Sequence, residues 1–208
     1  LEEMQRGNFR HLPVRTQGTG RVESIISMRD VGQSLVDGVC HDDVDPVAAS
    51  ASAAITVREM VHAHTRMRTG VTPSVVEVPK SSSVAEAVLQ MREHDVGSVI
   101  VPVEGASIAE SRHAFGIFTE RDYIRLLSEQ RDAGVDVRTA RIADVMTDDV
   151  TTIEPEARAI DALGLMSSQG VRHLPVVTPA RSLLAVLSSR DVMNHFLRPP
   201  FLRPPFPA

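Results

Sequence analysis

The stretch that decides the fold is "VRHLPVVTPARSLLAVLSSRDVM", residues 171–193, because it returns near the start of the chain as "FRHLPVRTQGTGRVESIISMRDV", residues 9–31. Both stretches contain RHLPV, a short variable gap, an apolar run and then Ser-x-x-Asp. Short apolar runs bounded by turn residues are typical of buried strands, and Ser-x-x-Asp is typical of a helix start. The repeat therefore predicts a strand–strand–helix unit that occurs at least twice.

A third, looser copy lies between these two. "DVGSVIVPV", residues 95–103, corresponds to the RHLPV segment, and "FGIFTERDYIRLL", residues 115–127, corresponds to the Ser-x-x-Asp segment. The stretches that precede the second and third copies also correspond, residues 75–91 with residues 150–166. Each of the two complete copies therefore predicts the order strand, helix, strand, strand, helix.

The first helix of each complete copy has a start signal. Ser83 and Glu86 form a capping-box pattern, and Pro155 suits a first helical position. Apolar residues then share one helical face in each copy. These residues are Val84, Val88 and Met91 in the second copy and Ala159, Leu163 and Met166 in the third. The other expected elements are strands at 96–103, 115–118, 171–177 and 183–187 and helices at 120–130 and 189–195.

These residues resemble the cystathionine β-synthase (CBS) domain family, whose tandem pair is called a Bateman module. The resemblance rests on "HLPV", "FTERD", "LSSRD" and "VMTDDVTTIEP" and covers residues 57–195. It implies an α/β (α+β) fold of tandem CBS domains, each a three-stranded mixed sheet with two helices, related by a pseudo-two-fold axis. The family's glycine before the Ser or Thr is present as Gly116, but it is Ala185 in the third copy and Ser24 in the first.

The expected organisation has five parts. They are the C-terminal half of a truncated CBS domain at 1–36, a linker at 37–56, CBS domains at 57–130 and 131–197, and a Pro-rich disordered tail at 198–208. The truncated copy lacks the strand and helix that would cover Leu12, Val14, Val22, Ile25 and Ile26. We therefore expect it to be poorly ordered or to lean on a neighbouring surface, because so short a unit cannot offset its conformational entropy. We interpret the chain as the tail of a longer protein with two Bateman modules, and we expect the complete pair to form a homodimer.

In this family the cleft between two CBS domains typically holds an adenosine derivative such as AMP, ATP or S-adenosylmethionine. A carboxylate can accept hydrogen bonds from ribose hydroxyls, a hydroxyl at a helix start suits a phosphate or ribose oxygen, and arginine forms bidentate bonds to phosphate. By this resemblance the expected nucleotide-binding residues are Thr119, Arg121, Asp122, Thr151, Arg172, His173, Ser188, Arg190 and Asp191, with Ser27 and Asp30 as counterparts in the truncated copy.

A purely structural interpretation stands beside this one. Ser or Thr followed three residues later by Asp is a helix cap whatever the function, and His11 and His173 can simply pack as strand residues. "CHDDVD", residues 40–45, and "VHAH", residues 61–64, contain metal-ligand types in an expected linker, without a spacing that fixes a coordination geometry. We therefore expect no metal site. No catalytic constellation is recognisable, so we expect neither an enzyme nor a required cofactor.

Composition limits the partners. The net charge is −5, aromatic residues make up 3% and Trp is absent, which disfavours nucleic-acid binding through phosphate contacts and base stacking. Cys40 is the only cysteine, which excludes an internal disulfide and favours a reducing intracellular compartment. No apolar run approaches the roughly 18 residues of a membrane span, so we expect no membrane insertion.

The sequence thus predicts a regulatory CBS-pair protein that senses an adenine nucleotide of the AMP, ADP or ATP class. The ligand would bias the relative rotation of the two CBS domains by binding one arrangement better. Two alternatives remain open. One is a structural dimerisation module with degenerate clefts, and the other is a regulatory fragment of a larger enzyme or transporter.

Overall fold

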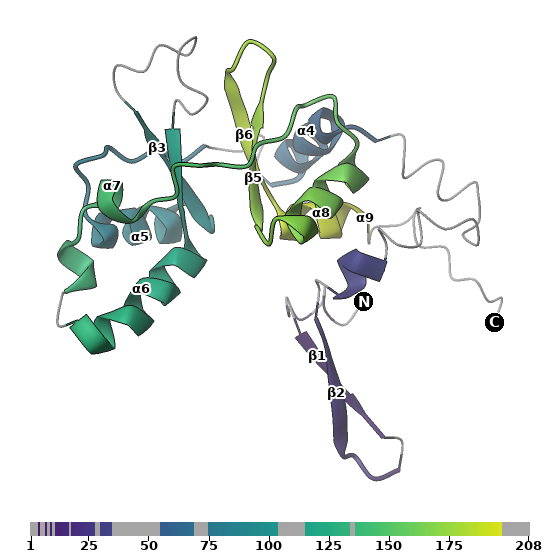
Figure 1. Ribbon diagram of the computed structural model, residues 1–208. Coiled ribbons are helices and arrows are strands. Elements are labelled where there is room, and N and C mark those ends of the chain that lie inside the picture. Colours follow the sequence, from purple (N-terminus) through teal and green to yellow (C-terminus); the bar gives the residue numbers. More distant parts are fainter. Residues whose placement is uncertain are drawn as a thin grey trace. The chain divides into compact units, whose positions relative to one another are not determined.

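The computed structural model describes residues 4, 7, 9, 11–16, 18–27, 30–34, 55–68, 75–103, 115–133 and 136–196 (Figure 1). The chain divides into two compact units, each built from segments of more than one repeat. The first comprises Leu1–Thr72, Ile153–Leu174 and Leu187–Ala208, and the second comprises Pro73–Thr152 and Pro175–Val186. Most of the expected linker, the loop at 104–114 and the Pro-rich tail lie outside the described residues.

The second unit contains the expected mixed three-stranded arrangement. Strand β3 (Ser98–Pro102) pairs antiparallel with β4 (Phe115–Thr119). The segment at 75–78 lies along the other side of β3, where Glu77 forms a parallel bridge with Ile100. The Val78 amide donates to the Ile100 carbonyl over 2.9 Å, and the Ile100 amide donates to the Val76 carbonyl over 2.8 Å. The residues of β3 from Ser98 to Val101 are all buried, which places this strand at the centre of the unit.

Two long helices accompany this sheet, α5 (Val84–Glu93) and α6 (Glu120–Ala133), followed by the 3-10 turn η1 (Val137–Thr139) and α7 (Ile142–Val145). The predicted helical face is confirmed. Val84 and Met91 are buried in one apolar cluster with Val99, Phe118 and Ile142, and Val88, Tyr123 and Leu126 pack against it.

The predicted capping box at the start of α5 is also confirmed. The Glu86 amide donates to Oγ of Ser83 over 3.2 Å, and the Ser83 amide donates to Oε2 of Glu86 over 2.7 Å. The Ser83 amide and the Ser83 hydroxyl both donate to the Glu86 carboxylate, which stabilises its charged form and holds the pKa of Glu86 below its ordinary value.

A second apolar cluster of this unit includes part of the last hairpin, formed by β5 (His173–Val177) and β6 (Leu183–Ser188). Leu183 and Val186 pack against buried Ile100, Ile117 and Val150. The β3–β4 pair therefore contributes side chains to two separate apolar clusters. This explains its almost uninterrupted apolar sequence, because a strand covered on both faces has no polar side.

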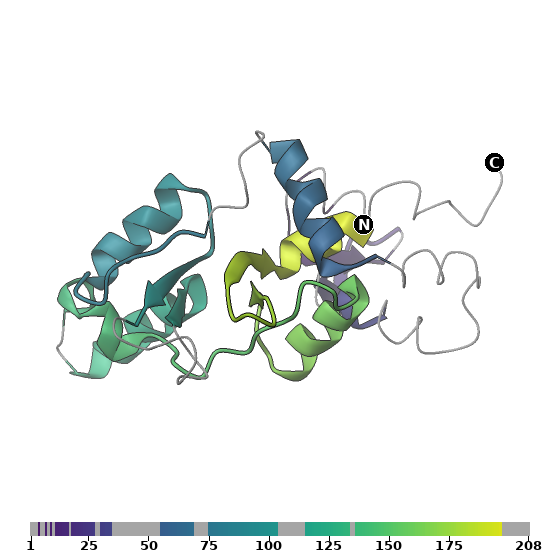
Figure 2. The same ribbon diagram turned by 90° about the horizontal axis from the view of Figure 1, so that it is seen from above.

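The first unit is built around three helices, α4 (Val57–Arg68), α8 (Ala159–Ser168) and α9 (Ser189–Phe196). Helix α4 packs against both α8 and α9, as Figure 2 shows from above. Val57 and Met60 of α4 are buried, and so are the predicted face residues of α8, which are Ala159, Leu163 and Met166. The VHAH motif lies within α4 and not in the expected linker.

The segment that leads into the second copy pairs with the first helix of the third copy. Thr56 forms a bridge with Arg158, in which the Val57 amide donates to the Ala157 carbonyl and the Ala159 amide donates to the Ile55 carbonyl, both over 2.8 Å. This pairing keeps Arg158 extended at ψ 146°. Helix α8 therefore begins only at Ala159, and the prediction that Pro155 opens the helix was wrong.

The reverse exchange occurs in the second unit. Ser83 bridges Arg141, the Val84 amide donates to the Ala140 carbonyl over 2.9 Å, and the Ile142 amide donates to the Ser82 carbonyl over 2.8 Å. In both cases, the segment that leads into one complete copy pairs with the residues just before the first helix of the other copy. The two copies are interdependent, because each supplies backbone partners for the helix start of the other.

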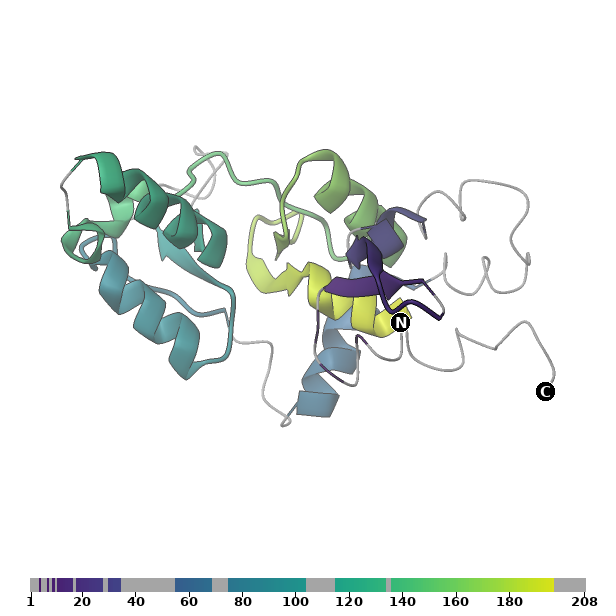
Figure 3. The same cartoon turned by 90° about the horizontal axis from the view of Figure 1, so that it is seen from below.

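The truncated copy forms an antiparallel hairpin of β1 (His11–Arg15) and β2 (Val22–Ser27), followed by a helical segment at 30–34 (Figure 3). Val22, Ile25 and Ile26 are exposed, whereas Leu12 and Val14 are half-buried. The helical segment lies against α8, where Oγ of Ser167 donates to Oε1 of Gln33 over 2.6 Å. The truncated copy therefore does contact a neighbouring repeat, through its helical segment.

Candidate functional site

The first candidate site lies where β4 ends and α6 begins. Thr119 donates to Oδ2 of Asp122 from its amide over 2.9 Å and from its Oγ1 over 2.7 Å. The Asp122 amide returns a bond of 3.4 Å to Oγ1 of Thr119. The Glu120 amide donates to the Gly97 carbonyl over 3.0 Å and so ties the helix start to the turn that precedes β3.

The two oxygens of Asp122 have different roles. Oδ2 accepts both bonds from Thr119, whereas Oδ1 accepts a single long bond of 3.4 Å from Nη2 of Arg125. The Asp122 side chain is mostly buried and Arg125 is largely exposed, so this ion pair is weak. Oδ1 is therefore the atom of this carboxylate that can accept a stronger hydrogen bond, such as one from a hydroxyl group.

The second candidate site has the same geometry at the junction of β6 and α9. Ser188 donates to Oδ2 of Asp191 from its Oγ over 2.5 Å and from its amide over 3.1 Å, and the Asp191 amide donates to Oγ of Ser188 over 3.2 Å. The Ser189 amide donates to the Arg172 carbonyl over 2.8 Å. This bond brings Arg172 to the start of α9, together with its strand neighbour His173.

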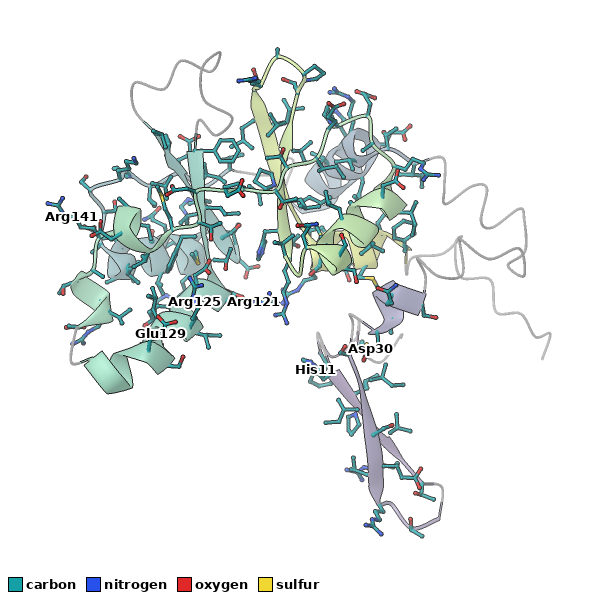
Figure 4. All side chains as sticks on the ribbon, in the orientation of Figure 1. His11, Asp30, Arg121, Arg125, Glu129 and Arg141 are labelled. Atoms are coloured by element: carbon teal, nitrogen blue, oxygen red, sulfur yellow. The ribbon has the colours of Figure 1, made fainter. Side chains whose placement is uncertain are left out.

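The truncated copy repeats the arrangement a third time. Ser27 donates to Oδ2 of Asp30 from its amide over 2.7 Å and from its Oγ over 2.8 Å, and the Asp30 amide returns a bond of 3.2 Å. His11 is the β1 partner of Ser27, and Figure 4 shows His11 and Asp30 at the same end of the hairpin. All three motifs act as helix caps in this structure, so the structural interpretation of these residues is correct. A ligand-binding role is an additional property, and it stays a prediction.

The arginines of the two complete motifs lie in the first turn of their helices. Arg121 is exposed in α6, and Arg190 is half-buried in α9. Amide groups and the helix dipole make a helix start favourable for anions, and an arginine beside it adds a second donor. The half-buried Thr151 belongs to the second unit, whereas Ser188 and Asp191 belong to the first, so its predicted role also stays a prediction.

Close backbone approach explains the glycine of the FGIFTERD motif. A methyl group on Gly116 would lie 2.5 Å from Sδ of Met146 and 3.1 Å from its Cγ. Met146 is held there because its neighbour Thr147 exchanges two backbone hydrogen bonds with Ile117, of 3.0 and 2.8 Å. The segment that leads into the third copy thus lies directly against β4, beside the first candidate site.

Sequence analysis did not predict two features of the structure. One is the backbone anchor from Gly97 and Arg172 to the starts of α6 and α9, for which no side-chain signal exists. The other is a capping box at the start of α4, where Thr56 and Glu59 exchange hydrogen bonds of 2.9 and 3.2 Å. Its Thr-x-x-Glu signal was present in the sequence.

The described part of the chain contains neither a metal-ligand cluster nor a helix that could span a membrane. There, no three or more His, Cys, Asp or Glu side chains gather in a way that would hold a metal ion. Among the same residues, no helix combines the length and apolar character that crossing a membrane requires.

Comparison with known sequences identifies the repeat. The model of the CBS domain family matches residues 67–129 and 142–198. The mitochondrial CBS domain-containing protein CBSX3 of Arabidopsis thaliana is 32% identical over 114 residues, which cover 54% of this chain and 52% of that protein. The chain therefore spans about half the length of this curated relative.

Solved structures share the fold. Protein MJ1225 of Methanocaldococcus jannaschii has a TM-score of 0.65 at 19% identity, and the match covers 94% of this chain and 62% of that one. The CBS domain protein PAE2072 of Pyrobaculum aerophilum, solved in complex with AMP, has a TM-score of 0.51 at 18% identity, with 66% of this chain and 89% of that chain covered. At these identities the likeness establishes the fold.

Proposed function

The chain belongs to the CBS domain family, and on this premise we propose that it is a regulatory protein that binds an adenine nucleotide of the AMP, ADP or ATP class. The observation that carries the proposal is the repeated Ser/Thr-x-Arg-Asp motif, held in one geometry at the starts of α6 and α9. The AMP complex of the Pyrobaculum relative supports the choice of ligand class.

In this proposal each motif supplies three kinds of contact. The aspartate accepts a ribose hydroxyl, in Asp122 through Oδ1, the oxygen that takes no part in the cap. The arginine before the aspartate, Arg121 or Arg190, donates to phosphate oxygens in a bidentate manner. At the second site Arg172 and His173 add donors from the start of β5. Thr151, in the segment before α8, is a further hydroxyl to which the proposal assigns a nucleotide contact.

Sensing requires that the ligand distinguish two states of the protein. A nucleotide that binds one arrangement of the CBS domains more tightly shifts the population toward that arrangement. We propose that this shift is passed on through a homodimer of CBS pairs. No catalytic step is part of the proposal.

The test is calorimetric titration of the purified chain with AMP, ADP and ATP. We expect measurable binding of at least one of them, and weaker binding in Asp122→Asn or Asp191→Asn. Asparagine keeps one oxygen for the cap but replaces the second acceptor with an NH₂ donor. The matched control is Glu86→Gln, which alters a capping box of the same geometry whose sequence has no arginine between Ser83 and Glu86. Equal binding by wild type and both aspartate variants would leave these residues as caps only, and no binding of any adenine nucleotide would reject the proposed ligand.

A further inference from the structure

The two complete candidate sites can be compared position by position, because the same backbone hydrogen bond anchors both. At the α6 site the Glu120 amide donates to the Gly97 carbonyl over 3.0 Å, and at the α9 site the Ser189 amide donates to the Arg172 carbonyl over 2.8 Å. Gly97 and Arg172 therefore occupy the same place beside the start of their helices. Glu120 and Ser189 are likewise equivalent, as the first residues of α6 and α9.

The two sites differ in charge at both of these places. At the α9 site Arg172 supplies an exposed guanidinium, and Ser189 is neutral. At the α6 site Gly97 has no side chain, and the exposed Glu120 adds a carboxylate. The α9 site has thus gained a cation where the α6 site has none, and the α6 site has gained an anion where the α9 site has none.

A third difference lies one turn into each helix. Nη2 of Arg125 donates to Oδ1 of Asp122 over 3.4 Å, so a cation already lies on the oxygen that would accept a ribose hydroxyl. The equivalent residue of α9 is the neutral Asn194. Arg125 therefore offsets one of the two carboxylates at the start of α6, and it does not add an excess of positive charge there.

The charged groups of the two sites can now be counted. At the α6 site two carboxylates balance two guanidiniums, which are those of Glu120, Asp122, Arg121 and Arg125. At the α9 site one carboxylate accompanies two guanidiniums, which are those of Asp191, Arg172 and Arg190. The α9 site therefore has an excess of positive charge, whereas the α6 site is balanced.

We propose that the two sites select nucleotides by the number of phosphates, so that the α9 site takes ADP or ATP and the α6 site takes AMP. This inference rests on the proposed nucleotide binding and adds which site holds which ligand. A phosphomonoester such as AMP carries a charge of about −1.5 to −2 at neutral pH, and each further phosphate adds negative charge. Arg172 can bind a longer phosphate chain in a bidentate manner, whereas Glu120 repels it.

Proteins with a single intact site test the selection. Asp191→Asn leaves the α6 site, and Asp122→Asn leaves the α9 site. Each is titrated by calorimetry with AMP and with ATP, at 0.1 M salt and with EDTA so that Mg²⁺ does not neutralise the phosphates. One exposed charge pair changes affinity by up to roughly fivefold. Because two positions differ, we expect the ratio of the Kd for AMP to the Kd for ATP to be at least about tenfold larger in the Asp122→Asn protein.

Exchanging the residue at the helix start should move this ratio in opposite directions. Glu120→Ser in the Asp191→Asn protein should tighten ATP binding roughly fivefold, and Ser189→Glu in the Asp122→Asn protein should weaken it by a similar factor, with smaller changes for AMP. Circular dichroism checks that each variant is folded.

The matched control is Glu129→Ser in the Asp191→Asn protein, which removes the same charge from the same helix. Figure 4 shows Glu129 further along α6 than Arg121 and Arg125. Glu129 stands about 13 Å along the helix axis from Glu120, and the Debye length at 0.1 M salt is about 10 Å. We therefore expect Glu129→Ser to leave the ratio of the two dissociation constants unchanged.

The outcomes separate this inference from the function on which it rests. Binding at both sites with the same ratio of AMP to ATP affinity would overturn the inference and leave the proposed function intact. A ratio that neither exchange moves, or that Glu129→Ser moves as far as Glu120→Ser, would also overturn it, and so would a single-site protein that binds neither nucleotide. A wild-type chain that binds neither AMP nor ATP would overturn both the inference and the proposed function.

Discussion

Replacing Gly116 by alanine tests the close approach that joins the second and third copies. The new methyl group would lie 2.5 Å from Sδ of Met146 and 3.1 Å from its Cγ and Cε, where carbon atoms in contact sit about 3.5–4.0 Å apart. Rotation of the end of the Met146 side chain does not relieve a clash at Cγ. The Met146 backbone is also held, by its own bond of 2.9 Å to the Ile142 carbonyl and by the pairing of Thr147 with Ile117.

The magnitude follows from two opposing effects. Overpacking of a fixed site costs about 1–3 kcal/mol. Loss of glycine freedom in the unfolded chain returns about 0.4–1 kcal/mol. We therefore expect Gly116→Ala to lower the free energy of unfolding by about 1–2 kcal/mol, measured as a lower urea midpoint at an unchanged slope.

Two companion variants make the result specific. Gly164→Ala, in the interior of α8, places its methyl group with no atom within 4 Å and should raise stability by about 0.5–1 kcal/mol through helix propensity. Met146→Ala combined with Gly116→Ala should cost less than the sum of the single changes, because shortening residue 146 removes the atoms that the new methyl group would meet. A Gly116→Ala protein as stable as the wild type, or additive effects in the double variant, would refute the proposed role of this glycine.

Two further predictions concern the capping boxes. Ser83→Ala should lower the free energy of unfolding by about 1 kcal/mol, measured by urea denaturation, because it removes the acceptor for the Glu86 amide; an unchanged midpoint would argue that α5 is held by its tertiary contacts alone. Hydrogen bonds from Thr56 and Ser83 lower the pKa of Glu59 and Glu86 below 4.5, so their contribution to stability is complete above pH 4.5 and is lost as the pH falls through the lower folded-state values. The midpoint temperature of thermal unfolding should therefore fall less steeply between pH 7 and pH 3 for a protein with both Glu59→Gln and Glu86→Gln than for the wild type. Parallel curves of midpoint temperature against pH would contradict this assignment.

The local elements were largely predictable because their signals are local. The apolar runs gave the strands β3 to β6 within a few residues, and the Ser/Thr-x-x-Asp motifs gave the starts of α6 and α9. Pro155 is the instructive error. A proline at that position is compatible with a helix start, but the exchange of backbone bonds with residues 55–57 keeps the chain extended up to Arg158. Such a pairing joins segments about 100 residues apart, and no local pattern encodes it.

The candidate sites were predictable as positions and not as functions. Thr119 and Asp122, which would frame a ligand, also close the cap of α6 through other atoms, so one pattern is compatible with two different roles. The close approach of Gly32 to Met193, where a methyl group on Gly32 would lie 3.4 Å from Sδ of Met193, could not be predicted for another reason. Gly32 and Met193 hold equivalent positions, five residues after Ser27 and Ser188, but equivalence says nothing about contact until the helices are placed.

The most direct test of the central claim is calorimetric titration with AMP and ATP of the wild type and of the combined Asp122→Asn and Asp191→Asn protein, with Glu86→Gln alongside. The account predicts that the wild type and Glu86→Gln bind at least one of these nucleotides with similar affinity, and that the combined aspartate variant, folded by circular dichroism, binds it at least tenfold more weakly, a loss of about 1.4 kcal/mol. Undiminished binding by the aspartate variant, or no binding by the wild type, would contradict it.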